Sequence, residues 1–523
     1  MPEPNETYKD IPETPIWRSQ QFYVLLLLLA ASRIFLFLTL SYTMDDAFIT
    51  YRYARNIAGG EGFVYNSGER VQGTSTPLFT LLLAGCAGVV GSDHIPAASR
   101  TIAFIADVFS LGILWGLLSA AGGPARFVTC ILFAMYPKIV LVSISGMETP
   151  LVVFLMLLSY LLLFEGKRTG LAFLVFGLLL LCRIDGIVWI LACLWRAGWE
   201  RMKGARWSAV GSASIPIAWL IFSQLYFGSW VPHSLVAKSV SYAHEFPWFD
   251  PVRVLVGYFP FEGLKGQSFV VQSIAVCALL VPVIIELIHL IRMKSTLAVF
   301  PIFFLAYNLA FSLGRTIVVD WYYFPGYIAY FVCVGSLIDS VLENARKKSG
   351  AMYVSLGTSL VVLLMVLLGF GASRWSRSLT SLYVHQNMAL GTWLKTHANR
   401  SAQVLVEPIG YIGWISEAYV HDYIGLTSSS VIAVRRRHPG SDAWFLEYVQ
   451  ERRPDYIVLR DWEMPTNRLF HGFGDGIFRG ETERAWFTMN YDQTQWNPGD
   501  TWTGPGPLVL YRKVGDWKNG GVQ

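Results

Sequence analysis

The sequence predicts a polytopic α-helical membrane protein that ends in a soluble α/β domain on the outer face of the membrane. Hydrophobic residues make up 54% of the 523 residues and charged residues only 15%, which is more apolar than soluble proteins. Apolar runs long enough to cross about 30 Å of hydrocarbon recur from Phe22 to about Ser373. Residues 376–523 lack such runs and alternate between helical and strand patterns.

The membrane part begins with a long apolar run that we expect to remain as a helix. No small-residue cleavage pattern follows residues 22–43, so this run does not have the pattern of a cleavable signal peptide. Further spans are expected at residues 76–91, 100–120, 149–164, 208–227, 269–291, 296–313, 322–342 and 352–372.

The basic loops set the orientation, because short cytoplasmic loops carry an excess of Lys and Arg. Four such loops are assigned to the cytoplasm: 165–168, 196–206, 291–294 and 343–348. For the first two to share a side, residues 170–199 must go out and return, which makes LCRIDG (181–186) an outer turn. The same count requires residues 126–145 to dip inward and return, with an inner tip at Tyr136-Pro137-Lys138, because proline removes a helical hydrogen bond. The scheme predicts about 11 to 13 spans.

Three parts follow from this topology. Residues 1–21 form a cytoplasmic N-terminal tail, residues 22–375 form the transmembrane domain with a first outer loop at 44–75, and residues 376–523 form the outer α/β domain. In the outer domain, helices are expected at 381–398 and 442–454 and strands at 403–408, 418–425, 455–461 and 508–514. Four polar residues near strand ends have no accompanying motif and are interpreted as structural: Glu407, His421, Asp422 and Asp461.

Charge and cysteine content exclude some classes of protein. The net charge of +5 is accounted for by the cytoplasmic loops, so we expect membrane lipid and no nucleic acid as a partner. All six cysteines lie in apolar segments and none has metal-ligand spacing, so the outer domain is expected to need no disulfide.

Polar residues from distant parts of the chain converge on the outer face in this topology. Ionisable groups in or beside membrane spans are costly and indicate function by default. The alternative for each one singly is an interfacial anchor. The set comprises Asp45, Asp46, Arg52, Tyr53, Glu148, Arg183, Asp185, His233, Lys238, Arg315, Asp320 and Trp321.

The adjacent aspartates Asp45 and Asp46 are the strongest candidates. They follow the first apolar run, and AFITYRYARNI after them predicts an interfacial helix. Capping of the helix N-terminus explains one carboxylate, but the second carboxylate gains little from capping. Two adjacent carboxylates repel each other, which raises the pKa of one unless a cation, a metal or a substrate hydroxyl lies between them. A purely structural cap stays the alternative, and the rest of the first loop is interpreted as scaffold.

Several motifs resemble one enzyme family. DDAFITYRYARN (45–56) and GGEGFVYNSGERVQGTSTPLFT (59–80) resemble the first outer loop of bacterial GT-C membrane glycosyltransferases, nearest to mycobacterial-type terminal arabinofuranosyltransferases that use decaprenyl-phosphate-linked arabinofuranose. Later outer-loop motifs are similar in the same order: SGMETPL (145–151), LCRIDG, YFGSWVPHSLVAK (226–238) and GRTIVVDWYYFPGYIAY (314–330). Ile184 departs from the proline usual in this family, and the C-terminal domain matches only in general. These departures bear on the sugar and the acceptor more than on the fold.

The resemblance implies roles for these residues. An outer-loop aspartate would act as general base on an acceptor hydroxyl, which attacks the anomeric carbon of a polyprenyl-phosphate-linked sugar. Asp45 and Asp46 match that motif, with Asp45 favoured as the base and Glu148 and Asp320 next in line. Cations for the leaving phosphate are expected among Arg183, Lys238, Arg315 and Arg52. Contacts to the sugar or the acceptor are expected from Glu148, Asp185, His233, Asp320, Trp321 and Tyr53.

The partners implied are a polyprenyl-phosphate sugar donor and a glycan, lipid or protein acceptor at the outer face of a bacterial cytoplasmic membrane. No cofactor is assigned; two carboxylates are too few ligands to assign a metal, and help from a divalent cation stays open. Two other classes also stay open. A flippase for lipid-linked sugars is expected to carry paired repeats and charges near mid-membrane, and neither is clear in this sequence. A non-catalytic glycan-binding assembly protein is expected to tolerate loss of the Asp pair.

Overall fold

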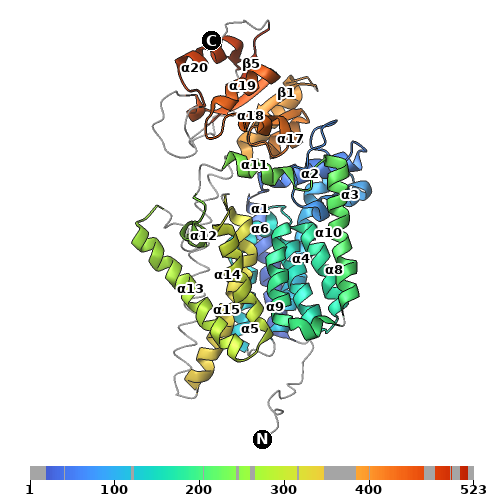
Figure 1. Cartoon of the computed structure of the whole chain (residues 1–523), viewed down its shortest axis with the longest axis vertical. Helices are drawn as coiled ribbons and strands as arrows, with labels where there is room; N and C mark the ends of the chain where they lie inside the picture. Colours follow the sequence, from blue (N-terminus) through green and yellow to red (C-terminus); the bar gives the residue numbers. More distant parts are fainter. Residues whose placement is uncertain are drawn as a thin grey trace.

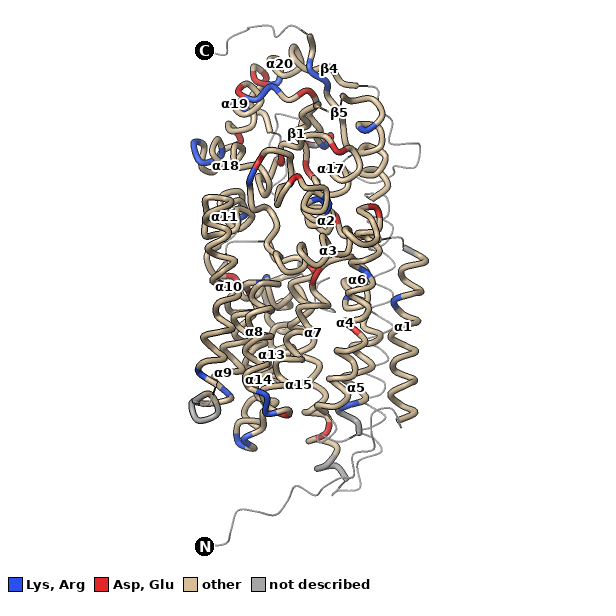
Figure 2. Tube along the Cα trace, turned by 90° about the vertical axis from the view of Figure 1, so that its right-hand side faces the viewer, with Lys and Arg blue, Asp and Glu red and all other residues tan. Residues whose placement is uncertain are grey.

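The computed structural model describes residues 19–40, 42–118, 123–203, 205–242, 247–258, 266–314, 317–346, 384–399, 401–464, 477–494, 496 and 507–515. They form a helical bundle with a smaller domain seated on one of its ends (Figure 1). We call this the domain end. The opposite end is called the basic end, because Lys and Arg of segments 165–168, 196–198 and 291–294 gather there (Figure 2).

The bundle is built from long and short apolar helices. Five described helices are long and apolar enough to cross a membrane, or six if the bent pair α5–α6 counts as one span, and four more are shorter. The chain thus has the helices of a multi-pass membrane protein, while the total of 11 to 13 spans stays a prediction and residues 352–372 lie outside the described residues. The bundle helices are α1 (Gln20–Leu40), α4 (Ile95–Leu117), α5 (Gly123–Met135), α6 (Pro137–Ile144), α7 (Thr149–Tyr160), α8 (Thr169–Cys182), α9 (Ile187–Lys203), α10 (Arg206–Phe227), α13 (Phe269–Arg292), α14 (Val299–Ser312) and α15 (Asp320–Arg346).

The connections at the two ends differ in kind. At the basic end they are short, and Arg196 of α9 donates to the carbonyl oxygens of Lys294 and Ser295, which brings two basic segments together. At the domain end they carry extra helices, namely α2 (Asp45–Ala58), α3 (Pro77–Val90), α11 (His233–Ser241) and α12 (Pro251–Val256). Proline stands in the first turn of several of these helices, where its missing N–H costs no hydrogen bond.

The chain bends at Tyr136 and does not reverse there. The axes of α5 and α6 differ by 51°, and Pro137 explains the bend because it has no N–H to donate to the preceding turn. Beyond the bend, Lys138 forms an ion pair of 3.1 Å with Asp320 at the start of α15. The carbonyl oxygen of Ser145 accepts a hydrogen bond from the chain just before α2. The inner tip expected at Tyr136-Pro137-Lys138 is therefore wrong, because the same proline signal marks a bend as well as a turn.

Helix α3 stays at the domain end. Its 14 residues span about 21 Å, which is short of the roughly 30 Å of hydrocarbon. Both of its flanks contact α2: Thr74 before α3 lies 3.4 Å from Thr50, and Ser99 after it lies 2.5 Å from Tyr51. The span expected at residues 76–91 is therefore wrong. Apolar composition did not distinguish a crossing helix from one that leaves and returns on the same face.

The C-terminal domain contains a five-stranded mixed sheet among the described residues. The strand order is β2-β1-β3-β5-β4, with β1 parallel to β2 and β3, and β5 antiparallel to β3 and β4. The strands and helices predicted here are confirmed, whereas α17, α18, α20 and β4 were not predicted. The elements are a helix over 384–397, β1 (Gln403–Val406), α17 (Gly410–Ser416), β2 (Tyr419–Asp422), α18 (Ser429–Arg435), α19 (Ala443–Arg452), β3 (Tyr456–Arg460), α20 (Glu481–Asn490), β4 (Tyr491–Gln493) and β5 (Leu508–Lys513).

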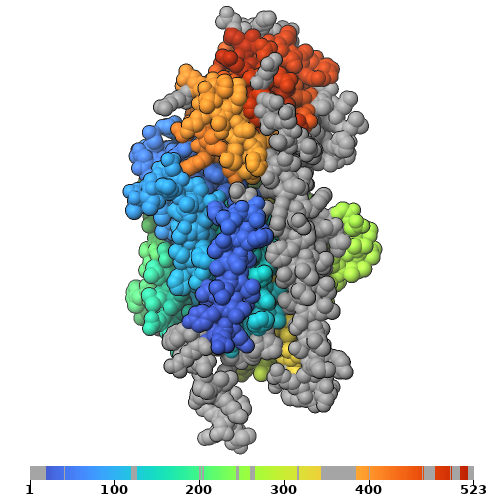
Figure 3. Space-filling model, turned by 180° about the vertical axis from the view of Figure 1, so that it is seen from behind, coloured from blue at the N-terminus to red at the C-terminus, as the bar shows by residue number. Residues whose placement is uncertain are grey.

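The two faces of the sheet have different neighbours. Alternate residues of β1 point to opposite faces, as expected for a strand. Val404 and Val406 pack in one apolar cluster with Ile49 and Tyr53 of α2, whereas Leu405 packs in another with α18, α19 and α20. The N-terminal segments therefore supply part of the core of the C-terminal domain, and this domain rests directly on them when seen from behind (Figure 3).

Candidate active site

A cavity of about 450 Å³ lies where the bundle meets the C-terminal domain. Its lining comes from α2, α11, the end of α14 with Gly314, the start of α15, residues 73–76, 147–148 and 183–185, and one residue of the C-terminal domain, Leu426. Because these segments are far apart in sequence, only the fold brings them together. Six of the predicted site residues line the cavity: Asp46, Glu148, Arg183, Asp185, Lys238 and Trp321.

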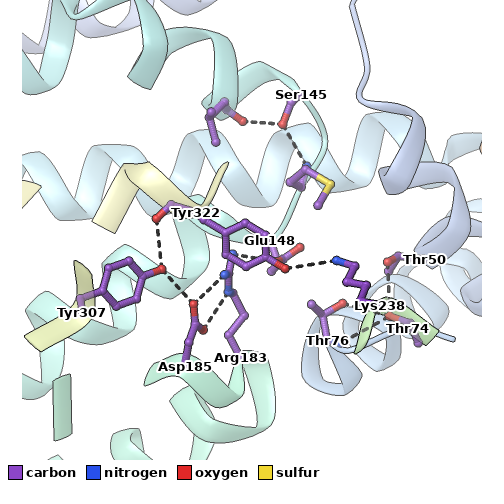
Figure 4. Close-up of polar contacts among 12 residues, drawn as sticks. Thr50, Thr74, Thr76, Ser145, Glu148, Arg183, Asp185, Lys238, Tyr307 and Tyr322 are labelled. Atoms are coloured by element: carbon purple, nitrogen blue, oxygen red, sulfur yellow. Dashed lines mark hydrogen bonds and ion pairs between the residues drawn. The ribbon is translucent and has the colours of Figure 1, made fainter. Parts of the chain in front are cut away.

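Arg183 lies at the centre of an ion-pair network on one wall (Figure 4). Its guanidinium donates to both carboxylate oxygens of Asp185, at 3.0 and 2.6 Å, and lies 3.4 Å from Oε1 of Glu148. The hydroxyl of Tyr307 donates to Asp185 at 2.9 Å, and the ring of Tyr322 lies 4.5 Å from the guanidinium. Arg183 and Glu148 are each only 5% exposed. Since one buried cation faces two carboxylates, this network holds no surplus positive charge.

The turn between α8 and α9 explains why Arg183 and Asp185 face each other. Arg183 is extended, with φ −154°, and residues 184–186 form a 3₁₀ turn before α9 begins. An extended residue followed by a tight turn lets side chains two positions apart meet. Ile184, which departs from the family's proline, is 56% exposed and takes no part in the network.

Lys238 brings positive charge to the cavity from α11. It lies in the last turn of this helix, and its Nζ is 3.4 Å from the hydroxyl of Tyr322. No carboxylate of the described residues lies within ion-pair distance of this Nζ. The charge of Lys238 is thus available to an anion, whereas that of Arg183 is already balanced.

Asp46 faces the cavity from the first turn of α2. Its carboxylate makes no hydrogen bond with any residue that the structure describes. Burial raises the pKa of Asp46, the charge of Lys238 lowers it, and Glu407 raises it further. A carboxylate with raised basicity and no bound partner can accept a hydrogen bond from a ligand hydroxyl.

Asp45 binds the C-terminal domain instead. Its Oδ2 accepts a hydrogen bond from the N–H of Gly410 at 2.7 Å, and its Oδ1 accepts one from the N–H of Tyr411 at 2.9 Å. These are the first amides of α17, so Asp45 caps α17, while the N-cap of its own helix is Met44. Burial raises the pKa of Asp45 to about 7 against these two hydrogen bonds. The capping geometry belongs to Asp45 and the cavity position to Asp46.

Arg52 belongs to the same contact between α2 and the C-terminal domain. Its guanidinium donates to the carbonyl oxygens of Gly413 and Ala418, at 2.8 and 2.7 Å. It also lies over the ring of Tyr65, at 4.3 Å from the centroid. Carbonyl groups at a helix C-terminus carry partial negative charge, which suits a cation. Arg52 is therefore engaged at the far end of α17 and does not line the cavity.

Three more predicted site residues, all in the described part of the chain, do not line the cavity. The hydroxyl of Tyr53 donates to a main-chain carbonyl of the first loop, at 2.5 Å. Asp320 is paired with Lys138, and His233 begins α11, one residue before the cavity lining. Arg315 lies outside the described residues.

A cluster of hydroxyl side chains in the cavity was not among the predicted site residues. Thr50 lies 3.4 Å from Thr74, and Thr74 lies 3.2 Å from Thr76. These three residues and Ser234 line the cavity. The sequence pattern that could have predicted this cluster is the run GTSTP (73–77), whose hydroxyl residues follow a glycine-rich loop. Each residue alone is common in loops, so the run was interpreted as scaffold.

No group of three His, Cys, Asp or Glu side chains that could hold a metal ion occurs among the described residues. Of the cavity carboxylates, Glu148 and Asp185 are engaged by Arg183.

Comparison with known sequences gives two partial matches. Residues 379–511 match a family model described as a domain of unknown function, DUF8728. A terminal beta-(1->2)-arabinofuranosyltransferase from Corynebacterium glutamicum is 28% identical over 241 residues, which cover 39% of this chain and 34% of that protein. The chain therefore spans about a third of the length of this curated relative.

Solved structures show a similar fold. ArnT from Cupriavidus metallidurans, bound to undecaprenyl phosphate, matches with a TM-score of 0.58 and 11% identity over 95% of this chain and 99% of ArnT. The archaeal oligosaccharyltransferase AglB from Archaeoglobus fulgidus, in complex with an inhibitory peptide and a dolichol-phosphate, matches with a TM-score of 0.50 and 12% identity over 84% of this chain and 69% of AglB. The chain shares the fold of these two proteins.

Proposed function

We propose that this GT-C chain is a glycosyltransferase that moves a sugar from a polyprenyl-phosphate donor to a cell-envelope glycan, lipid or protein. The observation that carries the proposal is the pair of groups in one cavity: within the described residues, the Asp46 carboxylate has no hydrogen-bond partner and Lys238 has no ion-pair partner. Such a transfer needs a base for the acceptor hydroxyl and a cation for the leaving phosphate. The lipid phosphates bound by ArnT and AglB support this donor class.

In the proposed reaction, the acceptor oxygen attacks the anomeric carbon while Asp46 accepts the proton of that hydroxyl. The bond between the anomeric carbon and the phosphate oxygen breaks, and the polyprenyl phosphate leaves with the electron pair. Negative charge grows on the leaving oxygen, and Lys238 offsets it by a charge-assisted hydrogen bond.

The proposal makes Asp46 the base, although the sequence favoured Asp45. Both carboxylate oxygens of Asp45 already accept hydrogen bonds from α17, so this residue would have to leave the C-terminal domain in order to reach a substrate. Asp46 needs no such movement, because it lines the cavity. We assign Asp45 to domain attachment.

Arg183 is proposed as a positioning residue and not as the main phosphate ligand. Its guanidinium faces Glu148 and Asp185, so a phosphate would have to displace a carboxylate to reach it. The same guanidinium lies against Tyr322, whose hydroxyl contacts Lys238. Arg183 thereby fixes the position of Tyr322, and Tyr322 in turn orients Lys238.

Arabinofuranose is the sugar we propose, supported by the named activity of the Corynebacterium relative. The site is proposed to face the exterior of a bacterial cytoplasmic membrane, supported by the basic segments at the opposite end of the bundle. In this orientation the polyprenyl chain stays in lipid while the sugar phosphate lies at the membrane surface.

A transfer assay tests the proposal. The purified full chain is incubated with a synthetic short-chain polyprenyl-phosphate arabinofuranose and an arabinofuranose oligosaccharide acceptor, in parallel with a glucose-bearing donor. We expect an elongated acceptor with the wild-type chain and a strong loss with Asp46→Asn. Scrambling of the lipid in liposomes without transfer supports a flippase and contradicts the proposal. Glycan binding with neither transfer nor scrambling supports an assembly protein and contradicts it as well.

A further inference from the structure

We infer that the hydroxyl groups of Thr50, Thr74, Thr76 and Ser234 form the subsite for the sugar ring of the donor, and that this subsite selects a neutral sugar. The inference rests on the proposed function and names the part of the cavity that holds the transferred group.

The threonine cluster provides the first observation. Thr50, Thr74 and Thr76 are each less than a tenth exposed and line the same cavity. Thr74 lies between the other two, with hydroxyl separations of 3.4 and 3.2 Å. A hydroxyl donates one hydrogen bond and accepts two. The hydroxyl of Thr74 is already surrounded by those of Thr50, Thr76 and Thr80 and by a main-chain N–H, so it orients the cluster. The hydroxyls of Thr50 and Thr76 retain capacity for a ligand. Sugar hydroxyls both donate and accept, which makes them suitable partners.

Ser234 provides a second, independent observation. It is 6% exposed and lines the cavity from α11, on a different element from the threonines. Its Oγ has no hydrogen-bond partner among the described residues. Buried hydroxyl groups are normally hydrogen-bonded, because an unpartnered one is destabilising. A hydroxyl of a bound ligand would satisfy this atom.

The subsite is next to both groups that the proposed reaction uses. Thr50 follows Asp46 by four residues on α2, and Lys238 follows Ser234 by four residues on α11, so each pair shares one helix face. The threonines surround the stem of Lys238, while Arg183 and Asp185 lie beyond its Nζ (Figure 4). A ring that contacts Thr50 and Ser234 would therefore lie between the base and the cation.

The lining of this part of the cavity favours a neutral sugar. Besides the hydroxyls it contains Ile49, Gly73 and Leu426, and its charged neighbours are the carboxylate of Asp46 and the ammonium group of Lys238. A sugar acid would compete with the donor phosphate for Lys238, and it would be repelled by the Asp46 carboxylate. An amino sugar would pair with it and occupy the base. A neutral pentose or hexose avoids both effects.

Binding measurements on the full chain test the inference. The probes are undecaprenyl phosphate and the same lipid phosphate carrying arabinofuranose or glucose. We expect Thr74→Val and Ser234→Ala each to weaken binding of a sugar-bearing lipid by about threefold to tenfold, which corresponds to the loss of one neutral hydrogen bond. Binding of bare undecaprenyl phosphate should stay unchanged. Thr74→Ser keeps the hydroxyl and should bind as the wild type does.

A matched control is available in Thr80→Val. Thr80 is buried in the same hydroxyl cluster, at 3.4 Å from Thr74, but it does not line the cavity. It should leave binding of all three lipids unchanged. Thermal unfolding identifies any variant that fails to fold, and Thr50→Val then takes its place.

Several outcomes overturn the inference. They are equal weakening of bare and sugar-bearing lipid, no weakening of either, or a wild-type chain that binds neither sugar-bearing lipid more tightly than undecaprenyl phosphate. Failure of the proposed function looks different, because a wild-type chain would then transfer no sugar. If transfer occurs but Thr74→Val and Ser234→Ala do not distinguish the lipids, only the sugar subsite is wrong.

Discussion

Asp45 and Gly410 lie 365 positions apart and are joined by a hydrogen bond of 2.7 Å from the backbone N–H to the carboxylate. A Cβ added at Gly410 would clash with the main-chain oxygen of Asp45. The approach of α17 to α2 is therefore close enough to require glycine at this position.

We expect Gly410→Ala to loosen the contact between the C-terminal domain and α2. The added methyl group has no room, and the shift it forces would break the hydrogen bonds to Asp45. The expected result is a lower midpoint of thermal unfolding and faster proteolysis between domain and bundle. Gly480→Ala is the control, because a Cβ there meets nothing within 4 Å. Unchanged proteolysis in Gly410→Ala would show that this contact does not hold the domain.

Asp45→Asn and Asp46→Asn should have different effects on turnover. Loss of a general base costs about 10²- to 10⁴-fold, and we expect this loss for Asp46→Asn with normal folding and membrane insertion. Asp45→Asn keeps an acceptor oxygen for α17, so its turnover should fall much less. Initial rates in the transfer assay measure both. A larger loss in Asp45→Asn would restore Asp45 as the base.

Lys238→Ala and Arg183→Ala should fail in different ways. Lys238 has no ion-pair partner among the described residues, so Lys238→Ala should fold normally but use the donor poorly, with partial rescue by Lys238→Arg. Arg183→Ala leaves Glu148 and Asp185 unpaired in a buried site, which costs about 3 to 5 kcal/mol of stability. Thermal unfolding together with donor saturation curves separates the two. Normal stability in Arg183→Ala would disprove its positioning role.

The pH dependence of activity should respond to Lys238. Burial raises the pKa of Asp46 and the charge of Lys238 lowers it. A general base works when ionised, so kcat/KM falls on the acid side of its pKa. Removing the cation removes the lowering effect, and the acid limb of the Lys238→Ala profile should therefore move to higher pH. A shift to lower pH, or none, would show that another group is titrating.

The orientation in the membrane can be tested with fusions. A reporter enzyme that is active only outside the cytoplasm should be active when fused after Gln523 and silent when fused after Lys347. The reason is the basic segments, which remain on the cytoplasmic side during insertion. The reverse pair of results would place Asp46 on the cytoplasmic face and contradict the proposed mechanism.

The length of the apolar runs predicted where helices form, but it did not predict which of these helices cross from one end of the bundle to the other. Residues 76–91 and 126–145 were both expected to add a crossing that the structure does not have. Each error removes one crossing, so the two cancel and the basic segments still share one end of the bundle. Charge balance between loops depends on this parity, so the predicted orientation is the same with or without the two extra crossings.

The candidate site shows a similar division. Five charged residues that line the cavity could be predicted from the sequence, because charge beside an apolar span is costly and therefore rare. They are Asp46, Glu148, Arg183, Asp185 and Lys238. The predicted residues that do not line the cavity, and the lining residues that were not predicted, depend on tertiary packing, which no local sequence pattern indicates. Helix α2 was expected to expose one face, but the C-terminal domain covers that face, so Arg52 and Tyr53 are buried in it. The hydroxyl cluster was missed because threonine in a loop is unremarkable until the fold encloses it.

Helix α17 has seven residues, too few to be stable in water by itself. Helix α2 binds both halves of α17, through Asp45 at its first amides and through Arg52 and Arg55 at the carbonyl groups of Gly413 and Trp414. The unit that unfolds cooperatively therefore extends across the boundary between soluble domain and bundle. In the full chain, the amides of residues 410–416 should therefore exchange with deuterium together with those of α2 and not as a separate local unit.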